Sequence, residues 1–199
     1  MSEVSEKIAE QLESESRSKL NSIIAVLVAV CASFMAIYGI KDNNIVQAMS
    51  QAQARGVDSW SYFQAKSTKQ NMTENQVAQL ELLLSINENA KDAVKQKITV
   101  QIQDAKARVQ KYETEKNQIK EQAESYQKEY DDLNIHDDQF DLAEALISLG
   151  LAIFGITALT QKKPLFYFGA VLSAIGILFG LAGFLGWGIH PEWLTKILG

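Results

Sequence analysis

Apolar residues gather in three stretches of the chain, and each stretch is long enough to form a helix that crosses a membrane. The first covers residues 22–40, the second 140–160 and the third 164–188. A helix of about 20 residues spans the roughly 30 Å hydrocarbon core of a bilayer. We therefore expect three transmembrane helices at these positions. Because only the residues QKK separate the second stretch from the third, these two helices are expected to form an antiparallel pair.

The polar segment between the first two stretches, residues 41–139, has a helical pattern of its own. From Ile98 to Leu133 its apolar residues follow alternating steps of three and four, which is the pattern of a coiled-coil seam. Lys116 is a polar residue at one of the seam positions. It would select the register or the number of partner helices, although an exposed seam edge would explain it equally well.

A helix with this modest seam needs a partner, either in the same chain or in a neighbouring copy. The preceding half of the segment is the in-chain partner, since its apolar residues also recur at helical spacing, and the residues INENA between the halves favour a turn at Asn87 or Asn89. We predict an antiparallel helical hairpin, a coiled-coil stalk outside the membrane. Gly56 and the capping-box pattern TENQ at residues 73–76 predict a kink or a short break in its outgoing helix.

The pattern as a whole predicts an all-α protein, and the charge distribution agrees with it. The predicted parts are an amino-terminal polar helix (1–21), transmembrane helix 1 (22–40), the extramembrane hairpin (41–139), transmembrane helix 2 (140–160), transmembrane helix 3 (164–188) and a short interfacial tail (189–199). The formal net charge is −5, and the charged residues are concentrated in the polar parts. This segregation is typical of a membrane protein with an aqueous domain. Acidic and basic residues are interleaved, so no nucleic-acid partner is expected.

The sequence lacks the patterns of common catalytic and cofactor sites. It has no glycine-rich phosphate loop and no cysteine pair, and His136 and His190 stand without a cluster of further ligands. The single cysteine, Cys31, excludes an intramolecular disulfide. We expect no enzymatic activity, no catalytic residue, no cofactor and no bound metal.

Basic residues beside the apolar stretches predict the orientation in the membrane. Arg17 and Lys19 precede the first stretch, Lys162 and Lys163 lie between the second and the third, and only Lys196 follows the third. Short loops rich in Lys and Arg stay in the cytoplasm. We therefore expect a cytoplasmic amino terminus, with the hairpin on the opposite side.

An aromatic cluster, Trp60, Tyr62 and Phe63, stands out in the polar segment. It is too concentrated for a solvated helix, so we expect it to pack against the returning helix or a neighbouring chain. The block SWSYFQAKSTKQ that contains it, placed after a first apolar stretch and before two closing ones, resembles a bacterial membrane-protein family catalogued as domain of unknown function 4337. The resemblance implies a bacterial inner-membrane protein and brings no activity or catalytic residue. Together with the orientation predicted from the basic residues, it places the hairpin in the periplasm.

One group of acidic and small residues lies at the start of the second stretch. Asp137, Asp141, Glu144 and Ser148 are spaced so that they share one helix face. Ionisable groups close to hydrocarbon usually face water or a protein interior. Copies of this face around an axis would form a cation-attracting pore mouth. The simpler alternative is that Asp137 and Asp141 complement a helix dipole and that only Glu144 enters the edge of the bilayer.

Small residues in the apolar stretches predict contacts between copies of the chain. Gly176 and Gly180 form a Gly-x-x-x-Gly motif, and Ala25 and Ala29 offer a smaller version in the first stretch. The residues expected at the oligomer interface are these four together with Tyr112, Ile119 and Tyr126 of the seam.

These observations lead to two functional hypotheses. The first is a homo-oligomeric inner-membrane scaffold that projects a helical stalk for spacing or for docking an envelope protein. The second is a cation-conducting channel, or an accessory to transport, lined by the acidic face of transmembrane helix 2. Membrane lipid and further copies of the chain are the expected partners under both hypotheses.

Overall fold

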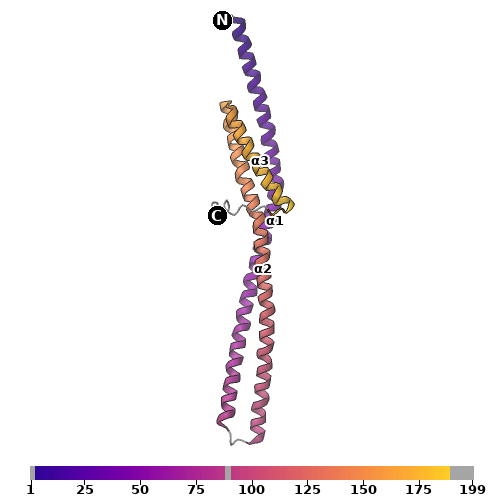
Figure 1. The fold of residues 1–199 in the computed structure, drawn as a ribbon, viewed down its shortest axis with the longest axis vertical. Helices are drawn as coiled ribbons and strands as arrows, with labels where there is room; N and C mark the ends of the chain where they lie inside the picture. The colour runs from indigo at the N-terminus through magenta and orange to yellow at the C-terminus, as the bar shows by residue number, and fades with distance from the viewer. Residues whose placement is uncertain (1–2, 88–90, 189–199) are drawn as a thin grey trace. The chain divides into compact units, whose positions relative to one another are not determined.

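The structure is a computed structural model that describes residues 3–87 and 91–188. These residues form three helices and no strand: α1 (Glu3–Ile86), α2 (Asp92–Thr160) and α3 (Lys163–Leu185) (Figure 1). The prediction of an all-α protein is confirmed for this part of the chain. The predicted interfacial tail, residues 189–199, lies outside the described residues, as does Asn89 of the predicted turn.

The short break predicted in the outgoing helix is wrong, because α1 continues through both positions. The alternative of a kink within the continuous helix stays a prediction. A glycine inside a helix costs about 1 kcal/mol relative to alanine, which a long helix tolerates at Gly56. The capping box at residues 73–76 is not used as a helix start. Thr73 Oγ1 donates instead to the Lys69 carbonyl at 2.8 Å, the bond that a threonine makes inside a helix.

The chain divides into two compact units, and α1 and α2 each contribute to both. The first unit contains residues 1–48 and 132–199, and the second contains residues 49–131. The apolar parts of all three helices belong to the first unit. All three helices are long and apolar enough to cross a membrane.

In the first unit α3 packs against α2 through glycines that face large side chains. Phe140, Ile147 and Phe154 recur at every seventh residue of α2 and are fully buried. The glycines Gly169, Gly176 and Gly183 recur at the same interval on α3, and a Cβ built on each would contact Phe154, Ile147 and Phe140 in turn. The order of these pairs shows that the two helices are antiparallel, as the short link predicted. We call Gly169, Gly176 and Gly183 the glycine face of α3.

Both ends of α3 are defined by local geometry. Gln161 in the link has a left-handed backbone with φ of 57°, and Pro164 stands in the first turn, where its missing N–H is not needed. At the other end Gly186 adopts φ of 72° and the Trp187 N–H donates to the Ala182 carbonyl at 2.9 Å. This is a glycine-based helix stop.

The second unit is a pair of antiparallel helical segments whose apolar seam is closed by residues of the same chain (Figure 1). Val77 of α1 packs in one cluster with Ile98, Ile102 and Ala105 of α2, and Leu80 and Leu84 lie against it. Farther along the seam Ile119 and Ala123 are also buried. The in-chain partner predicted for the seam is therefore confirmed.

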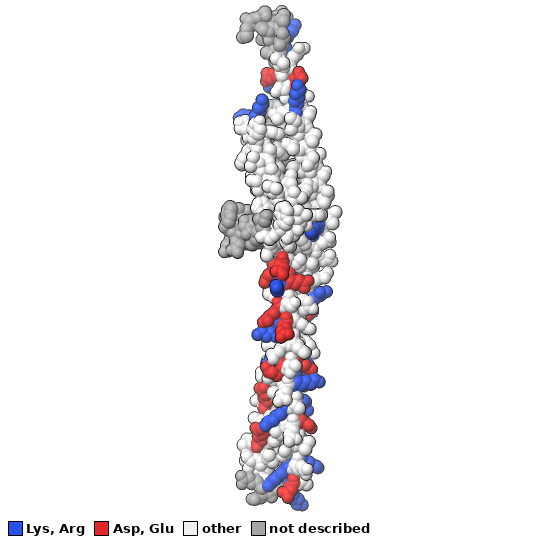
Figure 2. Space-filling model, turned by 45° about the vertical axis from the view of Figure 1, so that its right-hand side comes forward, with Lys and Arg blue, Asp and Glu red and all other residues white. Residues whose placement is uncertain are grey.

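Charged side chains are distributed differently over the two units (Figure 2). Along the second unit, acidic and basic groups are interleaved, as in the ion pair between Lys106 and Glu81 at 2.7 Å. In the first unit, a broad uncharged surface lies between two groups of charged side chains. Acidic residues dominate the group that adjoins the start of the second apolar stretch.

Candidate functional site

The predicted acidic face of α2 points outward in the first unit. Asp141, Glu144 and Ser148 are exposed, and Asp137 is half-buried. The neighbouring positions that point inward carry Phe140 and other buried residues of the α2 core. The acidic residues therefore share one face because an apolar stripe of the same helix occupies the opposite one.

Asp42 of α1, which the sequence did not single out, lies close to this acidic face. Tyr38 stacks on Phe140 with ring centroids 5.6 Å apart, and Asp42 follows it by one helical turn. Burial, and then the charges of Asp141 and Glu144, raise the pKa of Asp42 above its ordinary value. We call Asp42, Asp137, Asp141 and Glu144 the carboxylate cluster.

Burial and charge repulsion also act on Asp137. They raise its pKa from 3.8 to about 6, with burial the larger cause and the charges of Asp141, Asp42 and Asp138 following. A carboxyl group with this pKa changes its charge close to neutral pH. The groups interact, so the proton belongs to the cluster rather than to Asp137 alone.

Two hydrogen-bond donors next to the cluster in sequence, Lys41 and Gln139, bind backbone carbonyls at the end of α3. Lys41 Nζ donates to the Phe184 carbonyl at 2.5 Å and lies 4.6 Å from the centroid of that ring. Gln139, which is buried, donates to the Trp187 carbonyl at 2.7 Å. Both side chains bind carbonyls at the carboxyl end of α3, where helix dipoles favour positive charge and donors. They hold the end of α3 against α1 and α2.

The glycines predicted for contacts between copies pack inside the chain. A Cβ on Gly176 would lie 3.0 Å from the Ala143 carbonyl oxygen, and one on Gly180 would lie 2.8 Å from a ring carbon of Phe34. The close approach that glycine permits is therefore used here between helices of one molecule. Ala25 and Ala29, in contrast, are exposed on α1. The prediction that these four residues join copies together stays a prediction.

The three seam residues proposed for the oligomer interface face α1 of the same chain in the second unit. Ile119 is buried, and Tyr112 and Tyr126 are half-buried. The Lys66 ammonium lies 5.5 Å from the centroid of the Tyr112 ring. Contacts with further copies are again not tested.

The predicted aromatic cluster is only partly packed. Trp60 and Phe63 meet edge to face at 5.5 Å between ring centroids, and Phe63 is half-buried. Trp60 remains 38% exposed and Tyr62 54% exposed. The returning helix therefore does not cover these two rings, which leaves them open to a neighbouring molecule.

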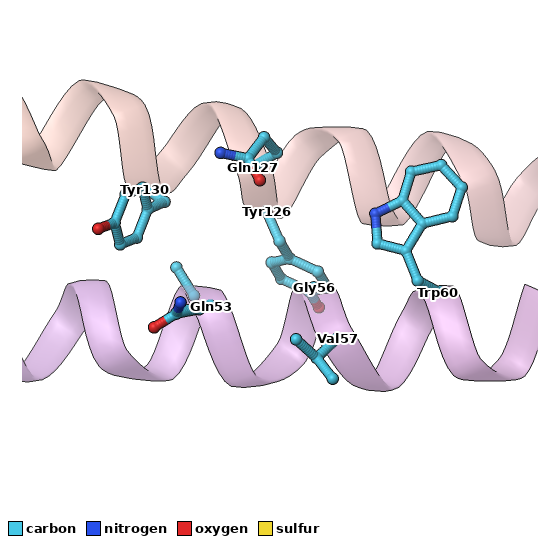
Figure 3. Close-up of a pocket in the computed structure, with 8 residues that line it drawn as sticks. Gln53, Gly56, Val57, Trp60, Tyr126, Gln127 and Tyr130 are labelled. Atoms are coloured by element: carbon cyan, nitrogen blue, oxygen red, sulfur yellow. The ribbon is translucent and has the colours of Figure 1, made fainter.

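Trp60 borders a hollow between α1 and α2 in the second unit (Figure 3). Its volume is about 240 Å³, and Gly56, Tyr126 and Tyr130 also line it. A Cβ on Gly56 would lie 3.8 Å from the Cβ of Tyr126, an ordinary contact. The glycine therefore leaves space beside the Tyr126 side chain that an alanine would partly fill. We call this space the aromatic hollow.

Polar side chains cross the seam at one level of the second unit. Lys66 pairs with Glu115 at 2.5 Å. Gln70, which is buried, donates to Glu113 at 2.6 Å and accepts a hydrogen bond from Lys116 at 2.9 Å. We call these five residues the polar layer.

The polar layer accounts for Lys116, the polar residue at a seam position. The Lys116 side chain is largely buried and also pairs with Glu113 at 3.1 Å, so the seam edge is not simply exposed there. Hydrogen bonding to Lys116 and Gln70 lowers the pKa of Glu113, and hydrogen bonding to Lys66 lowers the pKa of Glu115. A polar layer in an apolar seam favours the register in which its members are paired.

Within residues 3–87 and 91–188, no group of three or more His, Cys, Asp or Glu side chains is arranged to hold a metal ion. The carboxylate cluster is therefore a group of neighbouring charges and not a preformed metal cage.

Comparison with known proteins gives one result. The family model described as "Domain of unknown function (DUF4337)" matches residues 20–186. No curated protein and no solved structure matches the chain. The matched range contains the aromatic block, the polar layer and the carboxylate cluster. The chain therefore belongs to the DUF4337 family, as the block around Trp60 indicated.

Proposed function

We propose that the protein is a multi-pass inner-membrane scaffold of bacteria that assembles from several copies and presents a helical hairpin for spacing or docking. The observation that carries the proposal is that the polar segment between two apolar helices folds back on itself and closes its own seam. Such a hairpin needs no other molecule to cover its apolar residues. Its outer faces and its aromatic hollow stay available to a partner.

The three apolar helices support the placement in the membrane. Each is long enough to cross a bilayer. With the basic residues at the amino terminus and in the α2–α3 link on the cytoplasmic side, the hairpin is in the periplasm. Both of its arms then join the membrane on the same side, as an antiparallel hairpin requires.

The outward face of α1 supports assembly from several copies. Ala25 and Ala29 are exposed within the first apolar stretch, and small residues let helices approach closely in lipid. Native mass spectrometry of the purified protein should therefore show a defined homo-oligomer. Ala25→Leu with Ala29→Leu should weaken it, whereas Val26→Leu with Val30→Leu, at positions that are also exposed, should leave it intact. A monomeric wild-type protein would contradict the scaffold.

The exposure of Asp141, Glu144 and Ser148 favours a second candidate, a cation channel or transport accessory. A carboxylate at the edge of the hydrocarbon is expensive unless it faces water or protein, and a ring of copies would supply a water-filled axis. Ion flux into liposomes distinguishes the two functions. The channel is supported if the wild type conducts ions, the double variant Asp141→Leu with Glu144→Leu does not, and the control variant Asp104→Leu in the hairpin still does. No flux, together with an intact oligomer, supports the scaffold.

A further inference from the structure

The carboxylate cluster brings together acidic groups from two helices, and no ion pair joins it to a cation of residues 3–87 or 91–188. Asp42 comes from α1 and the other three members from α2, and the stacking of Tyr38 on Phe140 fixes the two helices at this level. One carboxylate oxygen of Asp42 is buried and has no hydrogen-bond partner among the described residues. Two carboxylates that share a site repel each other when both are ionised.

Among the described residues, the other ionisable groups at this level have partners outside the cluster. Lys41, on α1, binds the carbonyl of Phe184. On α2, His136 bonds to Gln139 at 3.2 Å and Asp138 accepts a hydrogen bond from Asn134. The adjoining end of α3 contributes carbonyl groups, since the ionisable residues of that helix, Lys163 and Tyr167, are in its first turn and a half.

Tyr38 supplies an independent indication that this place binds something. The residue is only 2% exposed, and its hydroxyl has no hydrogen-bond partner among the described residues. The hydroxyl lies within electrostatic reach of Glu144, Asp42 and Asp141. A buried hydroxyl without a partner is unfavourable, and here the charges of neighbouring carboxylates act on it.

We propose that Tyr38 and the carboxylate cluster form a proton-binding site, and that uptake of a proton strengthens the contact between α1 and α2. A proton removes the repulsion between neighbouring carboxylates and turns one of them into a hydrogen-bond donor. The buried oxygen of Asp42 and the hydroxyl of Tyr38 are then the available partners. The site does not depend on whether the protein acts as a scaffold or as a channel.

The direction of the pH effect follows from Asp137. Its pKa is raised to about 6 in the folded protein from 3.8. The stabilisation by the bound proton is therefore complete below about pH 4 and is lost as the pH rises through 6. A shift of this size corresponds to about a hundredfold change in the folding equilibrium for a fully shielded group. Asp137 is only half-buried, so we expect about tenfold.

Infrared difference spectroscopy on the full-length protein in detergent tests the site directly. Between pH 8 and pH 5, the wild type should gain a carbonyl band of a protonated carboxyl group with a midpoint near 6. Asp137→Asn should lose most of this band, and Asp104→Asn, at an exposed position in the hairpin, should retain it. Tyr38→Phe keeps the stacked ring but removes the hydroxyl that would accept a hydrogen bond from the protonated carboxyl group, so its midpoint should fall by about half a pH unit.

Thermal unfolding of the same variants supplies the second measurement. Asp137→Asn imitates the protonated side chain, so its stability at pH 8 should exceed that of the wild type and should depend less on pH. The hairpin contributes equally to the pH dependence of stability in the wild type and in the variant. The difference between their stabilities at each pH therefore reports on the carboxylate cluster alone. The proposal is overturned if no protonated carboxyl appears by pH 5 or if the band persists in Asp137→Asn. It is also overturned if calcium or magnesium at pH 8 reproduces the stabilisation, because the site would then bind a metal ion.

Discussion

Replacement of Gly176 by alanine should loosen the packing of α3 against α2. The new Cβ would lie 2.7 Å from Cγ1 of Ile147, 3.0 Å from the Ala143 carbonyl oxygen and 3.1 Å from the Ile147 nitrogen. Two of these three atoms belong to the backbone of α2 and cannot rotate away. The helices must therefore move apart by several tenths of an ångström.

The cost of this movement can be worked from the contacts that the glycine face makes. A buried side chain makes about 50 contacts of 0.1–0.2 kcal/mol each, and a gap of 0.5 Å forfeits about a quarter of that energy. For Ile147 alone this amounts to about 2 kcal/mol. Alanine recovers at most about 1 kcal/mol through its better helix propensity. We expect a net loss of about 1–2 kcal/mol, within the range known for overpacked cores.

Gly155→Ala is the matched control, because a Cβ at Gly155 has no neighbour within 4 Å. Both variants make the same chemical change in an apolar helix. Thermal unfolding in detergent should give a Tm about 4 °C lower for Gly176→Ala and an unchanged or higher Tm for Gly155→Ala. Native mass spectra should show the same oligomer for both. Equal stability of the two variants, or loss of the oligomer in Gly176→Ala without loss of stability, would refute the packing of this glycine within one chain.

Three further predictions concern the hairpin. Ile102→Ala, in the buried seam, should destabilise it by about 2–3 kcal/mol, seen as faster amide hydrogen exchange, whereas Val100→Ala at an exposed neighbouring position should change exchange little. Acidification should weaken the hairpin, because the pKa values of Glu113 and Glu115 are lowered in the folded protein from the ordinary 4.5. The stability that their charged forms contribute is complete above pH 4.5 and is lost as the pH falls through the folded pKa values. Helicity that is constant down to pH 2 would contradict this. Gly56→Ala should raise the free energy of unfolding by about 0.5–1 kcal/mol while it narrows the aromatic hollow, and a lower stability would show that the glycine is needed for packing.

The sequence predicted the elements of this protein better than it predicted their contacts. The apolar stretches and the three-four alternation depend on local patterns, which are visible in a single chain. The in-chain closure of the seam at Ile98 and Ile102 could be anticipated because the two arms have similar lengths. The expected break near Gly56 failed because one weak position does not interrupt a long helix that is supported by its partner.

Contacts between distant segments were harder to anticipate. The seven-residue interval of Phe140, Ile147 and Phe154 and the matching interval of the glycine face were both present in the sequence, but only their combination indicates packing within the chain. Read alone, Gly176 and Gly180 suggested a contact between copies. Asp42 was missed because its place beside Asp137 depends on how α1 pairs with α2.

The central claim is that the hairpin is held between membrane-spanning helices and lies wholly on one side of the bilayer. Single cysteines in a Cys31→Ser background, treated with a membrane-impermeant maleimide in intact cells, test it most directly. A cysteine at Asn117, in the hairpin, should react from the periplasmic side, and one at Lys162, in the link between α2 and α3, should react only after the cells are opened. Equal reactivity at both positions, or recovery of the protein in the soluble fraction, would contradict the account.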